Sequence, residues 1–226
     1  SAMKSQRLKD LYYTAILPAT IVSHYMWKLR IASGLSQRKV RKGPRGEVWL
    51  NLGCGSKQSP FMVNIDGNIF YRPEMWIDIR IGLPFPTASV DGIFACHVFE
   101  HFYWKELYRI LAECSRVLKR GGGLRFLVPS LELAIDNYVK GNSSWFPSFP
   151  HDFGSLGGRF MNFLFCEGNH RLCFDFGFAE EVLQGAKFAH VAKMKPMESR
   201  VFQSTVLQAL ESGIGEVSLI VEAIKA

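Results

Sequence analysis

Short apolar runs alternate with longer segments of helical periodicity from residue 47 to the end of this 226-residue chain. Runs of β-forming residues separated by helical segments are typical of a mostly parallel sheet whose strands are joined by crossover helices. We therefore expect an α/β three-layer sandwich. The expected strands cover residues 47–52, 62–65, 92–95, 124–128, 188–193 and 217–223, and the clearest helices cover residues 104–118 and 179–185.

The composition agrees with one large globular domain, since 48% of the residues are hydrophobic and 21% are charged. The net charge of +7 is unevenly distributed. Residues 1–46 hold ten basic residues and one acidic residue, a charge of +9, which leaves −2 for the rest of the chain. We expect a basic N-terminal extension and linker over residues 1–46 and a nearly neutral domain over residues 47–226.

The extension contains an apolar stretch, residues 11–27, with Pro18 near its centre. Polar residues interrupt it, so it falls short of the roughly 20 clean apolar residues that span a membrane. We favour a pair of short helices packed over the mouth of a ligand site. The alternative is a helix that lies in a membrane interface, because basic residues flank the stretch. Residues 36–46 resemble a basic linker that ends in a Gly-Pro turn.

The first expected strand of the domain leads into the loop Asn51-Leu52-Gly53-Cys54-Gly55. Glycines in such a loop let the backbone turn sharply and approach a ligand closely. The next expected strand ends at Asp66, where an acidic side chain can accept hydrogen bonds from both hydroxyls of an adenosine ribose. Asp78 lies further on, where its carboxylate could accept from the exocyclic amine of an adenine.

Four segments occur in order along the domain, namely NLGCG, NID, LPFPTASVDGIFACHVFEHF and VLKRGGGLRFLVPS. Together they resemble the type 11 group of class I S-adenosylmethionine-dependent methyltransferases, in particular a short-looped subgroup associated with surface-polysaccharide biosynthesis. The resemblance implies a Rossmann-like, mostly parallel seven-stranded sheet with an antiparallel last strand. It also implies S-adenosyl-L-methionine as cofactor and a small-molecule or glycan substrate.

The resemblance implies roles for individual residues as well. The glycine loop would line the methionine and ribose portions of the cofactor, Asp66 would hold the ribose hydroxyls, and His97 would face the sulfonium. Asp78 and Ile79 would flank the adenine. The full set of expected cofactor-binding residues is Asn51, Leu52, Gly53, Cys54, Gly55, Asp66, Gly67, Asp78, Ile79 and His97.

The chain departs from the usual pattern of this group in its first loop. The loop normally begins with an acidic residue and carries a third glycine, whereas Asn51 and Lys57 stand at those places. Few residues separate Gly53 from Asp66, and a parallel crossover normally takes a dozen or more. We therefore expect the first helix to be very short or absent. The same features argue against a nicotinamide dinucleotide site.

Methyl transfer to a hydroxyl needs a general base, whereas better nucleophiles do not. The candidate catalytic residues are His97, His101 and His170. For His101 a capping or packing role at the start of a helix is an equal alternative. The pair His151-Asp152 is a further candidate for substrate contact, and Asp152 and Asp175 could orient an imidazole. An aromatic stretch over residues 145–153 either stacks on a sugar or packs as a lid.

Other features have structural interpretations. Gly121-Gly122-Gly123 is expected to end a helix and turn into the next strand rather than cradle a phosphate. The five cysteines are widely spaced and form no CxxC pair, so we expect reduced thiols in a cytoplasmic protein. Cys54 is expected to be a small loop residue and not a nucleophile. The histidines and cysteines show no metal-ligand spacing, so no metal is expected.

Two functional hypotheses compete. The first is an enzyme that methylates a hydroxyl of a sugar or other small molecule in polysaccharide biosynthesis, in the cytoplasm and possibly against the inner face of the membrane. The second is a non-catalytic protein that keeps the fold as a binding or scaffold module, which Asn51, Lys57 and the short first crossover favour. A nucleic-acid substrate is not expected, because Ala95-Cys96-His97-Val98-Phe99 lacks the Asn/Asp-Pro-Pro-aromatic signature of amino-methylating nucleic-acid enzymes.

Overall fold

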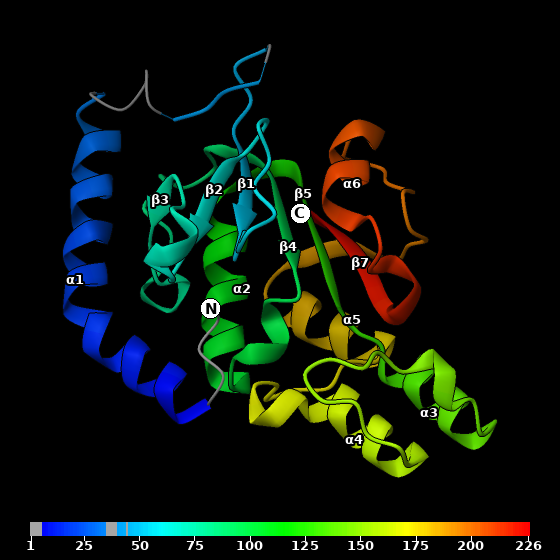
Figure 1. The fold of residues 1–226 in the computed structure, drawn as a ribbon. Helices are drawn as coiled ribbons and strands as arrows, with labels where there is room; N and C mark the ends of the chain where they lie inside the picture. Colours follow the sequence, from blue (N-terminus) through cyan, green and yellow to red (C-terminus); the bar gives the residue numbers. More distant parts are fainter. Residues whose placement is uncertain (1–5, 35–39, 44) are drawn as a thin grey trace.

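The computed structural model describes residues 6–34, 40–43 and 45–226, and a seven-stranded sheet forms its centre (Figure 1). The strand order is β3-β2-β1-β4-β5-β7-β6. Strand β7 runs antiparallel to both of its neighbours, β5 and β6, and the pairs among β1 to β5 are parallel. The strands are β1 Trp49–Leu52, β2 Val63–Asp66, β3 Met75–Trp76, β4 Val90–Cys96, β5 Leu118–Pro129, β6 Phe188–Lys193 and β7 Ser218–Lys225.

This topology confirms the Rossmann-like, mostly parallel seven-stranded sheet with an antiparallel last strand. The strand order reverses at β1, because β2 lies on one side of it and β4 on the other. Ligands of open α/β sheets bind outside the carboxyl ends of the strands at such a point. The loops after β1, β2 and β4 therefore mark the place to look for a site.

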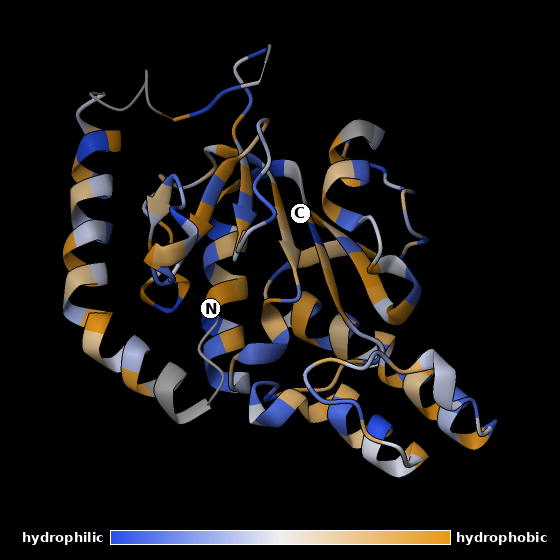
Figure 2. Cartoon of the chain, viewed as in Figure 1, coloured by the Kyte–Doolittle hydropathy of each residue, from blue (hydrophilic) through white to orange (hydrophobic). Residues whose placement is uncertain are grey.

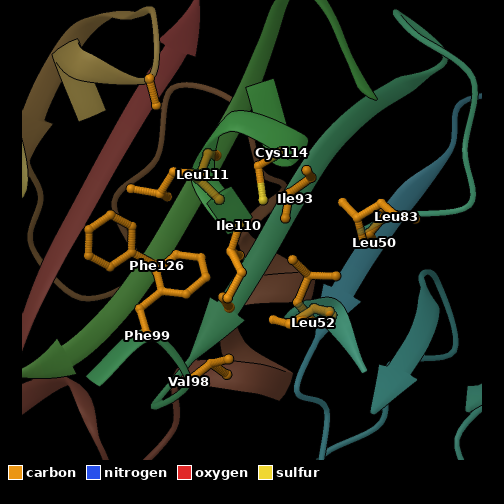
Figure 3. Close-up of a cluster of buried hydrophobic side chains, with 14 of the residues drawn as sticks. Leu50, Leu52, Leu83, Ile93, Val98, Phe99, Ile110, Leu111, Cys114 and Phe126 are labelled. Atoms are coloured by element: carbon orange, nitrogen blue, oxygen red, sulfur yellow. The ribbon is translucent and has the colours of Figure 1, made fainter. Parts of the chain in front are cut away.

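Apolar side chains on the two faces of the sheet form separate cores. Alternate residues of a strand point to opposite faces, so Leu50 packs on one face while Trp49 packs on the other. The first face is covered by α2 and α5, and Figure 3 shows Phe126 of β5 beside Ile110 of α2 within this cluster. The second face is covered by α6. Figure 2 shows the mainly apolar character of the central strands.

The helices over the described residues are α1 Gln6–Ala32, α2 Trp104–Val117, α3 Leu131–Val139, α4 Leu156–Phe165, α5 Phe176–Gly185 and α6 Ser204–Glu211. Residues 53–62, all of them described, contain no helix between β1 and β2. The expectation of a very short or absent first helix is confirmed. None of the helices over the described residues is long and apolar enough to cross a bilayer.

The expected pair of short N-terminal helices is wrong, because α1 is one helix that continues through Pro18. A proline removes one helical hydrogen bond and bends a helix without always ending it, and α1 changes direction about halfway in Figure 1. Packing holds the second half in place: Thr20 and His24 are buried, and the Ser23 hydroxyl donates to the Trp76 carbonyl of β3 at 2.7 Å.

The expected helix cap at Gly121-Gly122-Gly123 is also wrong. Helix α2 ends at Val117, and β5 begins directly at Leu118 with the glycines inside it. The pairing of β4 with β5 shifts register between Leu118 and Gly123, which is a bulge, and Gly121 adopts a φ of 78° in it. The glycines permit the bulge.

Candidate active site

The loop after β1 adopts the backbone conformation that its glycines suggested. Gly53 and Gly55 have φ values of 59° and 50°, the left-handed region that other residues rarely adopt. A Cβ on Gly53 would lie 2.5 Å from Cγ2 of Val98, so the loop packs directly against the segment that follows β4. A Cβ on Gly55 would meet no atom within 4 Å, so this side of the loop is open.

Asn51 and Leu52 shape this loop from inside the protein. Asn51 donates from Nδ2 to the Lys57 carbonyl and to Oδ1 of Asn64, each at 3.0 Å. Its side chain thus ties the loop to β2, to which no helix connects β1. Leu52 is fully buried in the core. Cofactor contact from either residue would come from the backbone, and it stays a prediction.

The carboxylate of Asp66 joins the first two loops. Its Oδ2 accepts from Gly55 N at 2.8 Å, and its Oδ1 accepts from Asn68 N at 2.7 Å. Each carboxylate oxygen keeps a second lone pair, so both can still accept from ribose hydroxyls. Burial raises the pKa of Asp66, and the two backbone hydrogen bonds partly offset this rise. The residue is therefore a preorganised acceptor beside the open side of Gly55.

Asp78 is a buried carboxylate that is already paired. Its two oxygens accept from the guanidinium of Arg80, the shortest contact being 2.6 Å from Nη2 to Oδ2. Ile79, next to it, is also buried. An adenine amine would have to share the Asp78 carboxylate with Arg80, so the adenine contact of Asp78 remains a prediction that the pairing does not favour.

Tyr13 of α1 lies against Gly67, directly after β2, and this contact was not expected from the sequence. A Cβ on Gly67 would lie 3.1 Å from its ring, and the Arg80 guanidinium lies 5.6 Å from the ring centroid. Burial first, and then the charges of Asp66 and Asp78, raise the pKa of Tyr13. Helix α1 thus lies over the expected ribose and adenine side, and its role as a lid stays a prediction. No local pattern marks Tyr13 among the apolar residues of its stretch.

His97 follows β4 with a φ of 54°, unusual for a residue other than glycine. Backbone strain of this kind costs about 1–3 kcal/mol and is typical of functional sites. The Ser218 hydroxyl donates to the Ile214 carbonyl at 2.7 Å, so its oxygen accepts from Nε2 of His97 at 3.0 Å. Nδ1 of His97 lies 3.3 Å from Oε1 of Glu100, an ion-pair distance without hydrogen-bond geometry.

The three candidate histidines surround one carboxylate, that of Glu100. Nε2 of His101 lies 4.0 Å from Glu100 Oε1, and the rings of His101 and His170 are 5.2 Å apart. Burial alone would raise the pKa of Glu100, but the three imidazoles outweigh it and hold this pKa below its usual value. Burial lowers the pKa of His170. We name these four residues, His97, Glu100, His101 and His170, the imidazole cluster.

His101 lies in the 3-10 helix Phe99–His101 and does not cap α2. The N-cap of α2 is Tyr103, whose backbone N–H donates to the Glu106 carboxylate. The helix-capping alternative for His101 is therefore wrong. Glu100 was not singled out from the sequence, and the signal that could have found it is its position between two candidate histidines in HVFEH.

The remaining candidates do not join the imidazole cluster. His151 pairs with Glu167, Asp152 pairs with Arg159, and Asp175 caps α5 by accepting from Phe178 N. Neither aspartate orients an imidazole, so that expectation is wrong. A pocket of about 280 Å³ lies next to the segment that carries His170. Phe165, which lines this pocket, accepts a hydrogen bond at its carbonyl from the His170 backbone N–H. The pocket is lined by His151, Phe153, Met161, Asn162, Phe165, Glu167 and Gly168.

A second pocket, of about 610 Å³, lies between α1 and residues 81–87. Neither pocket includes the glycine loop or Asp66, so cavity size alone does not locate the cofactor site. The expected position of the cofactor site therefore rests on strand topology and on the contacts of the glycine loop. Cys54 is buried in the loop, and burial raises the pKa of its thiol to about 12. It is a protonated packing residue, as its position suggested.

Comparison with known proteins finds similarity to methyltransferases. A family model described as a methyltransferase domain matches residues 74–126. A crystal structure of an S-adenosylmethionine-dependent methyltransferase from Archaeoglobus fulgidus is similar at 16% identity and a TM-score of 0.50, over 95% of this chain and 100% of that one. An S-adenosylmethionine-dependent methyltransferase from Thermotoga maritima, a possible histamine N-methyltransferase, has 15% identity, a TM-score of 0.49 and 97% coverage of both chains. No curated protein matches the sequence.

The strand order and the match of residues 74–126 to a methyltransferase domain agree with the Rossmann-like fold of class I S-adenosylmethionine-dependent methyltransferases. The methyltransferase domain model that matches residues 74–126 implies S-adenosylmethionine as the cofactor. The residues present fit it: a loop whose glycine Cα faces open space at Gly55, and a carboxylate held beside it at Asp66.

Proposed function

We propose that this protein transfers a methyl group from S-adenosylmethionine to a hydroxyl of a sugar or other small molecule in polysaccharide biosynthesis. The observation that carries the proposal is the imidazole cluster, which follows β4 and adjoins the glycine loop through the contact of Gly53 with Val98. The polysaccharide part rests on the resemblance of the sequence motifs and not on a contact.

The chemistry of such a transfer fits the cluster. The acceptor oxygen bonds to the methyl carbon as the carbon–sulfur bond breaks, and the electron pair of that bond stays on sulfur to give S-adenosylhomocysteine. Because a hydroxyl is a poor nucleophile, its proton must be removed, and the cluster supplies basic nitrogens for this. The buried Glu100 carboxylate stabilises the positive charge that then develops on an imidazole.

The pocket beside His170 supports a sugar-sized acceptor. Phe153 and Phe165 contribute aromatic rings to its lining, and Asn162 and Glu167 contribute polar groups. A mainly apolar pocket with a few polar groups is the usual form of a small-molecule site. The rings could stack on the apolar face of a sugar, and the polar groups could bind its hydroxyls.

The scaffold hypothesis keeps support from two observations. Asp78 is neutralised by Arg80, and Tyr13 lies over the expected adenosine side. A protein whose cofactor edge is permanently covered would keep the fold without turnover. Because α1 also carries exposed apolar side chains, peripheral membrane contact at the inner face of a membrane is compatible with either function. The exposed large apolar side chains over residues 11–32 are Leu11, Leu17, Ile21, Val22, Tyr25, Met26 and Leu29.

The decisive experiment follows label transfer from methyl-labelled S-adenosylmethionine to a panel of glycosides, with amines as comparison acceptors. We expect transfer to a hydroxyl and a fall in kcat of roughly 10²-fold or more in His101→Gln. The matched control His190→Asn, which changes an exposed imidazole on β6, should retain activity. Cofactor binding without transfer to any acceptor would support the scaffold hypothesis, and transfer to amines alone would contradict the hydroxyl substrate.

A further inference from the structure

We propose that Glu100, His101 and His170 form a binding site for a divalent transition-metal ion of the zinc type. One ligand atom from each of the three side chains can be chosen so that all three lie within 4.8 Å of one another. Two imidazoles and one carboxylate form a known donor set for zinc, with a fourth position left for water or substrate.

Both imidazoles are already oriented as metal ligands. Nδ1 of His101 lies 3.0 Å from the Asn169 carbonyl, and Nδ1 of His170 lies 2.9 Å from the Leu164 carbonyl. A carbonyl only accepts, so each Nδ1 carries the proton and each Nε2 keeps its lone pair. Metal-ligating histidines almost always donate their other N–H to a carbonyl, carboxylate or water in this way.

Glu100 supplies an independent reason. Its side chain is fully buried, and no described group donates to either carboxylate oxygen with hydrogen-bond geometry, the nearest nitrogen being Nδ1 of His97 at 3.3 Å from Oε1. Buried carboxylates normally accept several hydrogen bonds or coordinate a metal, because an unsatisfied buried charge is costly. A cation bound at Oε1 or Oε2 would satisfy this group.

The backbone holds the three ligands together. Arg171 N and Leu172 N both donate to the Glu100 carbonyl, at 2.7 and 3.2 Å. This contact fixes the segment that carries His170 against the turn that carries Glu100 and His101. The site needs only side-chain adjustment to close, since tetrahedral zinc with bonds of about 2.1 Å places its ligands about 3.4 Å apart. His101 is partly exposed and leaves a path for the ion.

The ligand spacing in the sequence does not match a metal-binding motif, so the site was not predicted. Glu100 and His101 are adjacent, but the third ligand comes from a distant segment, after α4. The absence of a metal motif led to the expectation that no metal binds, and the folded arrangement points the other way. The site goes beyond methyl transfer as such. With an ion bound, His101 and His170 would be ligands and no longer bases, and an acceptor hydroxyl coordinated to the ion would lose its proton more readily.

The test titrates Co²⁺, a spectroscopic substitute for zinc, into the full chain and records the visible d–d bands together with the binding isotherm. We expect one equivalent with a tetrahedral spectrum. Glu100→Gln and His170→Gln should each weaken binding by roughly tenfold or more, in line with the sensitivity of metal affinity to the ligand environment. His190→Asn should bind as the parent does, because its imidazole lies outside the site.

His101→Gln gives a second reading, because this side chain is partly exposed and its removal leaves the core intact. Circular dichroism and binding of S-adenosylhomocysteine show whether each variant is folded. Folded variants that lose Co²⁺ but keep S-adenosylhomocysteine support the site. No binding of Co²⁺ to the parent, or equal binding to the parent and to folded His170→Gln, overturns the proposal and leaves the methyl-transfer function untouched.

Discussion

Single residues in the glycine loop show how tightly the cofactor site is specified. Gly53→Ala combines an unfavourable φ with a clash against Val98, so we expect it to lower the free energy of unfolding by roughly 2–3 kcal/mol. Gly55→Ala has the same φ problem but no clash, and should cost only about 1–2 kcal/mol. Urea unfolding of the two variants measures this difference.

The loss in Gly53→Ala should be partly rescued by adding Val98→Ala, which removes the clashing Cγ atoms. If Gly53→Ala and Gly55→Ala were equally stable, the packing of the loop on the segment after β4 would be wrong.

The sequence predicted several single residues of the candidate site correctly in their backbone setting. Gly53, Gly55 and Asp66 were predicted because their roles depend on local backbone conformation and strand ends.

Residues that act through distant contacts were not predictable in the same way. Tyr13 reaches Gly67 only because α1 folds back over β3, and Ser218 reaches His97 only because β7 inserts beside β5. Glu100 is adjacent to His101 in sequence, yet its burial depends on the segment around Arg171. A local sequence pattern cannot predict contacts between segments that are far apart in the chain.

Among the elements, α1 shows the greatest difference between expectation and structure. The helix continues through Pro18, where a break was predicted, and it buries His24. Burial, and then the charge of the nearby Lys28, lower the pKa of this imidazole. The unfolded chain, with an ordinary histidine pKa of about 6.5, then binds more protons than the folded one. Folded stability is present above that pKa and falls as the pH drops below about 6.5.

We therefore expect α1 to loosen on mild acidification, which hydrogen exchange of residues 11–32 between pH 7.5 and 5.5, corrected for intrinsic rates, would detect. His24→Phe keeps the apolar packing and lacks the titrating group, so it should remove the pH dependence. Unchanged protection of α1 across this range would contradict the burial of a neutral His24.

The same helix tests the membrane alternative. Val22→Glu with Leu29→Glu places charge on two exposed apolar positions of α1 without touching Thr20 or His24. If α1 contacts membranes, binding to anionic lipid vesicles in a sedimentation assay should fall with this change. Vesicle binding that is absent in the parent would leave only the lid role for α1.

In the molecule as a whole, one of the two cores contains a buried charge network. The α6 face contains a buried guanidinium, Arg125, paired with Glu211 at 2.5 Å and with Glu222 at 3.4 Å. Arg125→Leu would leave two buried carboxylates without their cation, and should lower the free energy of unfolding by roughly 3–5 kcal/mol. Thermal and urea unfolding measure the loss, and Lys119→Leu, which breaks an exposed pair with Asp91, should cost far less.

The overall architecture was predictable because its signals are periodic and local. Six of the strands and both clear helices lie where apolar period and length place them, whereas β3 has only two residues and α3, α4 and α6 lack long amphipathic patterns. The bulge at Gly121-Gly122-Gly123 was missed because it depends on pairing with β4, which no local propensity encodes.

The central claim is that this chain binds S-adenosylmethionine through the loop at Gly53 to Gly55 and the carboxylate of Asp66. Calorimetry of S-adenosylmethionine and S-adenosylhomocysteine with the parent, Asp66→Ala and the control Asp136→Ala tests it most directly. Asp136 is an exposed carboxylate on α3, far along the chain from the loop. The account predicts micromolar binding that Asp66→Ala abolishes and Asp136→Ala preserves; folded parent protein that binds neither compound would contradict it.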